Sequence, residues 1–130
     1  MTATILVDNG TELLSDALLA LVGASVTASG FYVGWGTGGS STGGTATNTD
    51  VDLEAPATES RVSCTGETQA GDTNTFIGTL QTTTEKFIEE VGLYIDATGT
   101  ATDMIIRANH GGVNMATDDQ IEYTWTLKIT

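Results

Sequence analysis

The hydrophobic residues of this chain follow a helical period near the start and a strand period from residue 30 onward. Across residues 11–22, leucine, alanine and valine recur at three- and four-residue spacing, which predicts a helix with one broad apolar face. Asn9 and Thr11 are candidate N-terminal caps, and Gly23 is a natural stop. This face either packs on the rest of the fold or forms an assembly contact. The leucines expected at such a contact are Leu13, Leu14, Leu18 and Leu21.

Residues 30–130 consist of short runs that alternate hydrophobic and polar positions, separated by turn residues. The last run is the most regular, because every second residue from 121 to 129 is hydrophobic and the residues between them are polar. The chain contains 16 glycines and one proline, and many of them fall at the turns, so the pattern predicts an antiparallel β-sandwich of Greek-key or jelly-roll type. The fold class is therefore mainly β with one N-terminal α-helix, in a single domain of residues 1–130. Its expected core residues are Trp35, Leu93, Tyr123, Trp125 and Leu127.

Residues 36–49 are rich in glycine, serine and threonine, and we expect a loop that is too polar to bury. The glycines of residues 34–39 resemble a phosphate-binding loop in composition. Such a loop needs a lysine followed by serine or threonine at the start of a helix, whereas no lysine precedes Lys86. We therefore interpret this segment as a turn that leaves a strand.

Charge narrows the range of partners. Seventeen acidic residues face four basic ones, which gives a net charge of −13. Nucleic acids and anionic membranes are bound through clustered lysines and arginines, so this balance argues against both. Acidic side chains at this density repel one another, and the repulsion falls when salt shortens the Debye length. We therefore favour a protein adapted to high salt; the alternative is a surface that negative charge keeps soluble at ordinary salt.

The chain offers few residues for catalysis. His110 is its one histidine and lies in a turn-like sequence at residues 108–112, so a catalytic triad has no other general base. We expect no enzymatic activity and no cofactor. Asp50, Asp52 and Glu54 alternate along one extended segment and are weak candidates for a bound cation such as Ca²⁺. A solvated acidic face is the other interpretation of these three residues.

Glu90 lies in a hydrophobic run in which Phe87 and Leu93 share one face, and a carboxylate there needs a partner. Arg61 adjoins another predicted strand, and arginine pairs with carboxylates through two hydrogen bonds. We therefore predict a structural ion pair between Arg61 and Glu90. Cys64, the only cysteine, alternates with hydrophobic residues in that other strand and is expected to be a buried thiol.

The apolar run at residues 18–26 is similar in composition to the hydrophobic region of a signal peptide. Acidic residues at positions 8, 12 and 16 precede it instead of a basic segment, so we expect no cleavage. No apolar run approaches the roughly 20 residues that a membrane-spanning helix needs.

Several of these segments occur in an order that resembles small structural proteins of many tailed phages and of haloarchaeal tailed viruses. The order is a glycine-rich turn (32–38), a Thr/Ser/Gly loop, an acidic segment (50–53), Glu-Ser-Arg (59–61), a Glu-x-Gly-Leu-aromatic strand (88–94), an arginine-bearing strand (104–108) and a closing strand with Trp125. A similar order resembles the collar domain of phage tail fibres. The likeness covers about residues 30–129, and the order of the motifs carries it rather than any one motif.

This resemblance implies a virion component without known catalysis, assembled in the host cytoplasm. We expect a capsid decoration or turret subunit on the outside of the head, which forms a trimer or pentamer with itself and contacts a major capsid or tail protein. A tail, collar or fibre-anchor protein is the closest alternative. A secreted carbohydrate-binding module is a second one, in which Trp35, Trp125 and the tyrosines stack on sugar rings. The apolar position of Trp125 favours the core instead.

Overall fold

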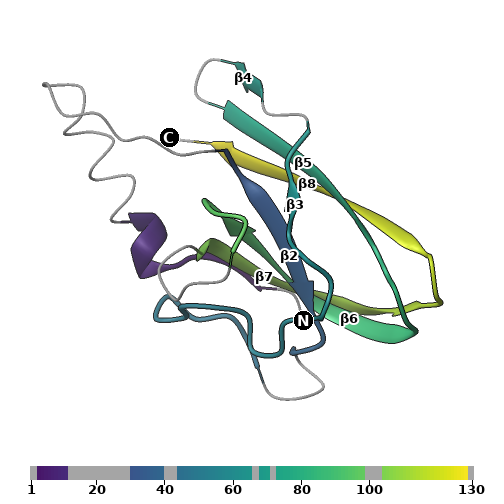
Figure 1. Cartoon of the computed structure of the whole chain (residues 1–130). Helices are drawn as coiled ribbons and strands as arrows, with labels where there is room; N and C mark the ends of the chain where they lie inside the picture. The colour runs from purple at the N-terminus through teal and green to yellow at the C-terminus, as the bar shows by residue number, and fades with distance from the viewer. Residues whose placement is uncertain are drawn as a thin grey trace, which may run out of the picture.

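The computed structural model describes residues 3–11, 30–39, 44–65, 68–70, 73–98 and 104–128, and β-strands make up most of them (Figure 1). Their bounds are β1 (Ala3–Leu6), β2 (Tyr32–Gly36), β3 (Val62–Ser63), β4 (Thr68–Ala70), β5 (Thr73–Gln81), β6 (Lys86–Tyr94), β7 (Met104–Met115) and β8 (Gln120–Lys128). A five-stranded sheet has the order β1-β7-β6-β2-β3, and a three-stranded sheet has the order β4-β5-β8. The paired strands within both sheets run antiparallel. The predicted mainly β, antiparallel fold with two sheets is therefore confirmed.

A helical turn follows β1 at residues 8–11. The Thr11 amide donates a hydrogen bond to the Val7 carbonyl oxygen at 3.0 Å, which places Val7 at the N-cap position. The helix therefore begins before Asn9 and Thr11, and the prediction that one of these residues caps it was wrong. The rest of the predicted helix, residues 12–22 with the four leucines expected at a contact, lies outside the described residues.

The main core lies between the two sheets. Trp35 of β2 and Leu93 of β6 belong to it from the larger sheet and Trp125 of β8 from the smaller one, and they are 2%, 0% and 8% exposed. Tyr123 and Leu127 are half-buried and pack against the same cluster. The alternation of β8 in the structure thus matches its sequence, with Trp125 on the inward face and exposed polar residues on either side.

β5 approaches β2 closely at Gly78. A Cβ atom on Gly78 would lie 2.6 Å from Cγ2 of Val33, nearer than van der Waals contact allows. Glycine at this position therefore lets the two sheets come together over Val33, which is fully buried.

A β-bulge changes the alternation of β6. The pairing of β6 with β7 shifts between Ile88 and Glu90, and the extra residue puts Ile88 in the core and Phe87 on the outside. Phe87 is 41% exposed and lies over Gly112, where a Cβ atom would come within 1.8 Å of the ring. The expectation that Phe87 shares the core-facing side was therefore wrong. The turn expected at residues 108–112 was also wrong, because these residues lie within β7, where Gly112 makes room for this ring.

The opposite face of the larger sheet carries a second apolar cluster, formed by Val7, Leu53, Tyr94 and Met104. The chain after β2 crosses this face and returns along the free part of the β2 edge, where Gly36 forms an isolated bridge with Pro56.

The loop expected at residues 36–49 begins inside β2. Gly38, Gly39 and Ala46 are buried, so the expectation that this segment is too polar to bury was wrong for these residues. The backbone amides of Gly38 and Ala46 donate hydrogen bonds to a buried carboxylate and to a buried side-chain amide oxygen, and these bonds explain their burial.

Candidate functional site

Glycines on the outer face of the larger sheet make room for the segment that follows β2. Gly36 of β2 pairs with Glu90 of β6, and Gly34 pairs with Gly92 two residues farther along. These positions lie on one face of the sheet, so Glu90 is the only one of the four with a side chain. A Cβ atom on Gly36 would lie 2.4 Å from Glu90 Oε1 and 2.5 Å from the Ala55 carbonyl oxygen. The backbone reaches Glu90 because glycine occupies this position.

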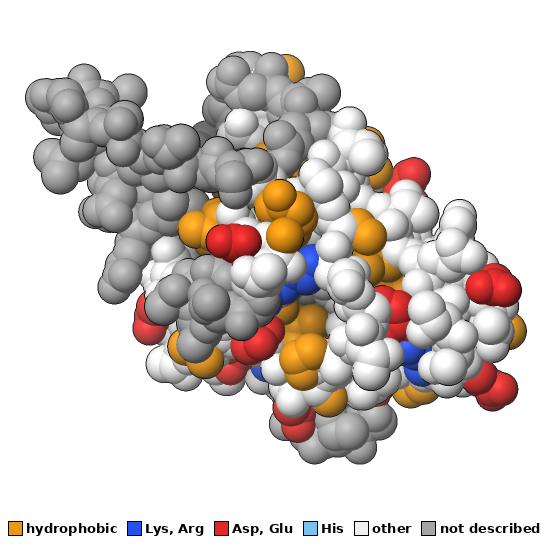
Figure 2. Space-filling model, viewed as in Figure 1, with side chains coloured by type: hydrophobic (Ala, Val, Ile, Leu, Met, Phe, Trp, Pro, Cys, Tyr) orange, Lys and Arg blue, Asp and Glu red, His pale blue; other side chains and the backbone are white. Residues whose placement is uncertain are grey.

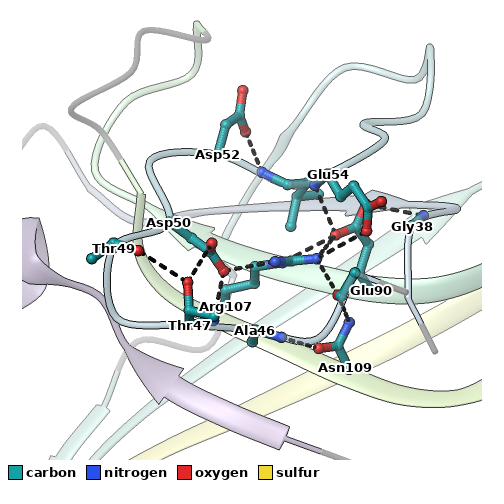
Figure 3. Close-up of polar contacts among 12 residues, drawn as sticks. Gly38, Ala46, Thr47, Thr49, Asp50, Asp52, Glu54, Glu90, Arg107 and Asn109 are labelled. Carbon is teal, nitrogen blue, oxygen red and sulfur yellow. Dashed lines mark hydrogen bonds and ion pairs between the residues drawn. The ribbon is translucent and has the colours of Figure 1, made fainter. Parts of the chain in front are cut away.

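Glu90 is fully buried and binds both the crossing segment and an arginine (Figure 3). Its Oε1 accepts hydrogen bonds from the amides of Gly38 at 3.1 Å and Ala55 at 2.8 Å. Its Oε2 accepts from the Glu54 amide at 3.0 Å, and from Nε and Nη2 of Arg107 at 3.1 and 2.8 Å. Both carboxylate oxygens are thereby satisfied, which offsets the cost of burying the charge. These bonds fix the segment to the sheet.

Arg107 extends the same network from β7. Its side chain is 3% exposed, and it donates from Nη1 to Asp50 Oδ2 at 2.6 Å and from Nη2 to the Gly44 carbonyl oxygen at 2.7 Å. Asn109, two residues farther along β7, accepts from the Ala46 amide at 2.6 Å and donates to the same Gly44 oxygen at 3.2 Å. Figure 3 shows Arg107 between Asp50 and Glu90, with Asn109 next to Ala46.

Asp50 and Arg107 are stabilised in their ionised forms. Burial alone would raise the pKa of the Asp50 carboxyl, but hydrogen bonds from Thr47 and Arg107 outweigh burial and lower that pKa. Burial likewise opposes the charge of Arg107, and its bonds to Asp50 and Glu90 raise the pKa of the guanidinium. One arginine therefore serves two carboxylates at hydrogen-bond distance, with Asp50 on the surface side and Glu90 in the interior.

The structure pairs Glu90 with Arg107, which corrects the predicted ion pair between Arg61 and Glu90. Arg107 stands opposite Gly92 across β6 and β7, so it is a diagonal neighbour of Glu90 on the same face. Arg61, which directly precedes β3, instead lies over Tyr94 at the end of β6, with its guanidinium carbon 3.4 Å from the centre of the ring. The signal for the true partner is that Arg107 also lies in a hydrophobic run, where a charge needs an opposite charge on a neighbouring strand.

The three acidic residues considered for a cation pair with other side chains of the protein. Asp50 and Glu54 both face Arg107, at 2.6 and 3.9 Å, whereas Asp52 accepts a hydrogen bond from the Tyr94 hydroxyl at 2.8 Å. Bends in this segment break the extended geometry that the alternation assumed. Among the residues that the structure describes, no three acidic, histidine or cysteine side chains gather as cation ligands.

A second buried ion pair joins Glu59 to Lys86 at the start of β6. Glu59 Oε1 accepts hydrogen bonds from the Lys86 ammonium and from the Thr83 amide, the latter at 3.0 Å. Burial alone would raise the pKa of the Glu59 carboxyl, but these hydrogen bonds outweigh burial and lower the pKa to about 2. The Glu59 side chain is 6% exposed.

His110 lies in β7 and connects the two sheets. Its Nε2 is 3.0 Å from the Tyr123 hydroxyl of β8, and burial raises the pKa of that hydroxyl. An open cleft of about 320 Å³ lies beside this contact, and its lining includes Val91 and Trp125. The histidine ring thus contributes to the contact between sheets.

Comparisons with protein-family models, with curated proteins and with solved structures give no match for this chain. Within the described ranges, no helix has the length and apolar character needed to cross a membrane.

Proposed function

We propose that this chain is a non-enzymatic structural subunit of a tailed virus particle, positioned as a decoration or turret protein on the outside of the head. The observation that carries the proposal is the convergence of the segments that resemble such proteins. The glycine-rich turn, the acidic segment, the strand of Glu90 and the strand of Arg107 meet in one buried network. The segments that carry the resemblance thus form the network that holds the chain after β2 on the five-stranded sheet.

The chemistry of this network supports a structural role. Every hydrogen bond of Glu90 and Arg107 described above goes to the protein's own backbone or to an opposite charge. A buried, fully bonded carboxylate holds its partners in one geometry, and this rigidity suits a subunit that must keep its shape in a particle. The net charge of −13 supports a particle surface in brine, where salt screens the repulsion between subunits.

A tail, collar or fibre-anchor subunit with the same fold is the alternative within the particle. A carbohydrate-binding module with an exposed aromatic platform has less support, because Trp35 and Trp125 are 2% and 8% exposed and their rings pack in the core. A stacking platform needs ring faces that a sugar can reach.

The position of the chain in intact particles tests the proposal. Antibodies raised against the purified protein would be applied to particles from the source lysate and located by electron microscopy. We expect labels over the whole head, in a regular array after image averaging, and a trimer or pentamer of the purified chain in molar salt. Labels confined to the tail would support the alternative instead. If no particle carries label on its head or its tail, the head position and the tail position are both contradicted.

A further inference from the structure

β8 is the outer strand of the three-stranded sheet, and one of its edges meets no other described strand. It pairs with β5 along its whole length, from Gln120 to Lys128, without a register shift. Edge strands of natural proteins are usually short, bulged, or interrupted by proline or charge, which prevents pairing with other chains. β8 has nine residues and no proline or bulge, and Glu122 and Lys128 are its only charged residues. It therefore keeps the regular geometry that a further strand needs.

The hydrogen bonds of β5 show which backbone groups of β8 point to the free edge. The Ile77 carbonyl oxygen of β5 accepts a hydrogen bond from the Thr65 amide at 2.8 Å and is therefore not bonded to Thr124, its pairing partner in β8. Bonded and non-bonded pairs alternate in an antiparallel ladder, so the amide and carbonyl of Thr124 point away from β5. Those of Glu122 and Thr126 point the same way, because the direction repeats every second residue. Across the described ranges, no backbone partner meets these three residues.

The cleft of about 320 Å³ opens beside this edge. Val91 of β6 and Ala108 of β7 line it from the larger sheet, and Trp125 lines it from β8. Thr4 of β1 also lines the cleft, so the larger sheet continues past β8 on the side where a further strand would lie. Such a strand would direct every second side chain into the cleft and the others to the outer surface.

Charge restricts the composition of an added strand. None of the described residues that line the cleft is an aspartate or a glutamate, although the chain contains 17 acidic residues. Elsewhere, acidic side chains are scattered over the face shown in Figure 2, with few basic ones between them. Glu122 is exposed on the outer side of β8, opposite the polar positions of an added strand. Hydrophobic side chains therefore suit the cleft, and basic ones suit the outer side.

A second copy of the chain that paired through its own β8 does not fit this edge. Antiparallel strands that pair across such an interface are related by a two-fold axis perpendicular to the sheet, so the larger sheets of both copies would lie on the same side. Both larger sheets continue past β8 and would occupy the same space. The edge therefore suits a single extended segment rather than a second sandwich.

We propose that β8 binds an extended segment of another protein, which joins the three-stranded sheet as an antiparallel strand. The segment has hydrophobic residues at every second position, directed into the cleft, and basic residues between them. Its backbone bonds to Glu122, Thr124 and Thr126. In this binding mode, main-chain hydrogen bonds provide the affinity and alternate side chains provide the specificity. The site does not depend on a position in a virus particle.

A synthetic peptide tests this site on the ¹⁵N-labelled full chain. The probe is the capped peptide Lys-Val-Thr-Val-Lys-Val-Thr, in which valines alternate with polar residues. We expect saturable chemical-shift changes at the amides of Glu122, Thr124 and Thr126. At a peptide concentration about ten times the Kd, these amides should exchange with solvent about tenfold more slowly. The amide of Glu85, an exposed residue in the connection from β5 to β6, is the reference and should keep its exchange rate.

Related peptides separate the strand pattern and the charge from composition. A peptide of the same residues with its valines adjacent should bind at least about tenfold more weakly, because it cannot direct all three into the cleft. A peptide with glutamates in place of the lysines should also bind more weakly. N-methylation of the second lysine removes an amide that bonds to β8 in the antiparallel arrangement, and it should weaken binding about tenfold without any change to the protein.

A variant of the protein tests the same edge. Thr124→Pro removes the central outward amide, and proline is tolerated on an edge strand where the N–H faces solvent. It should bind the peptide about tenfold more weakly, whereas Thr124→Ser, the matched control, should bind as the parent does. The amide spectrum shows whether each variant is folded.

The proposal is overturned if the alternating peptide gives no saturable shift at the three amides, or if the peptide with adjacent valines binds as well. It is also overturned if the N-methylated peptide, or the folded Thr124→Pro protein, retains the parental affinity. Slow exchange of the three amides at high protein concentration without peptide would assign the edge to a second copy and overturn the proposal as well.

Discussion

Glu90 and Arg107 are diagonal neighbours on β6 and β7, joined by hydrogen bonds of 3.1 and 2.8 Å, and neither side chain is more than 3% exposed. The pair also binds backbone groups of a segment that lies far away in the sequence, including the Gly44 carbonyl and the Ala55 amide. The five-stranded sheet, the crossing segment and the buried charges therefore depend on one another. Removal of Arg107 leaves the carboxylate of Glu90 in the interior without its counter-ion.

Arg107→Met should lower the free energy of unfolding by about 3–5 kcal/mol, because it leaves Glu90 buried without its counter-ion. Arg61→Met is the control, since it removes a half-buried arginine that the sequence had favoured as the partner of Glu90, and it should cost about 1–2 kcal/mol. Urea denaturation measures both values. Combining each change with Glu90→Gln should give a coupling energy above about 1 kcal/mol for Arg107 and near zero for Arg61. Equal coupling energies would show that Glu90 interacts no more strongly with Arg107 than with Arg61, which would contradict the pairing.

Acid should weaken the fold partly through Glu59. Its pKa is about 2 in the folded protein and 4.5 without the fold, so the folded state favours the ionised form. The stabilisation is complete above about pH 4.5 and is lost as the pH falls toward 2. The melting temperature of the parent should therefore fall more steeply over this interval than that of Glu59→Gln. Parallel curves for the two proteins would rule out this contribution.

Salt should stabilise the fold. The chain has seventeen acidic residues and four basic ones, so its excess negative charges repel one another at low ionic strength. Molar salt shortens the Debye length to about 3 Å and screens this repulsion. The melting temperature should rise steeply between low and molar NaCl. Replacing the exposed Glu85 and Glu122 by glutamine changes the net charge from −13 to −11, because −13 + 2 = −11, and should reduce the slope. A melting temperature independent of salt would leave solubility as the reason for the charge.

Trp125→Ala should cost about 3–5 kcal/mol of stability, because the ring fills the inward face of β8 next to Phe76 of β5. The exposed Thr124 and Thr126 should tolerate serine within about 0.5 kcal/mol. Chemical denaturation of the three variants compares the two faces of the strand. A Trp125→Ala protein as stable as its parent would place the ring outside the core.

Local pattern was enough to predict β8 and the burial of the charge at Glu90. The alternation of the closing strand fixes which face is buried, and a carboxylate inside a hydrophobic run requires a partner wherever it folds. The three residues of β4 and the first strand carry too little pattern to be predicted, and β1 is held in place by its pairing with β7.

The identity of the partner depended on strand register, which the sequence does not reveal. One inserted residue at the bulge between Ile88 and Glu90 moves Phe87 to the outside, and the register of β6 with β7 puts Arg107 beside Glu90. The burial of Gly38 and Ala46 was missed for a related reason. A polar, glycine-rich segment is buried when distant side chains satisfy its backbone, and such contacts leave no local signal.

Amide hydrogen exchange in Glu90→Gln tests most directly the claim that Glu90 holds the crossing segment on the sheet. Glutamine keeps the shape of the side chain, but it has one acceptor oxygen, and its NH₂ group faces donors. The amides of Gly38, Glu54 and Ala55, which all donate to Glu90 in the parent, should exchange at least about tenfold faster in the variant, as expected for loss of about 1.4 kcal/mol of local protection. The amide of Tyr123 in β8 serves as the internal reference and should change less. Unchanged exchange at the three amides in a folded Glu90→Gln protein would contradict the account.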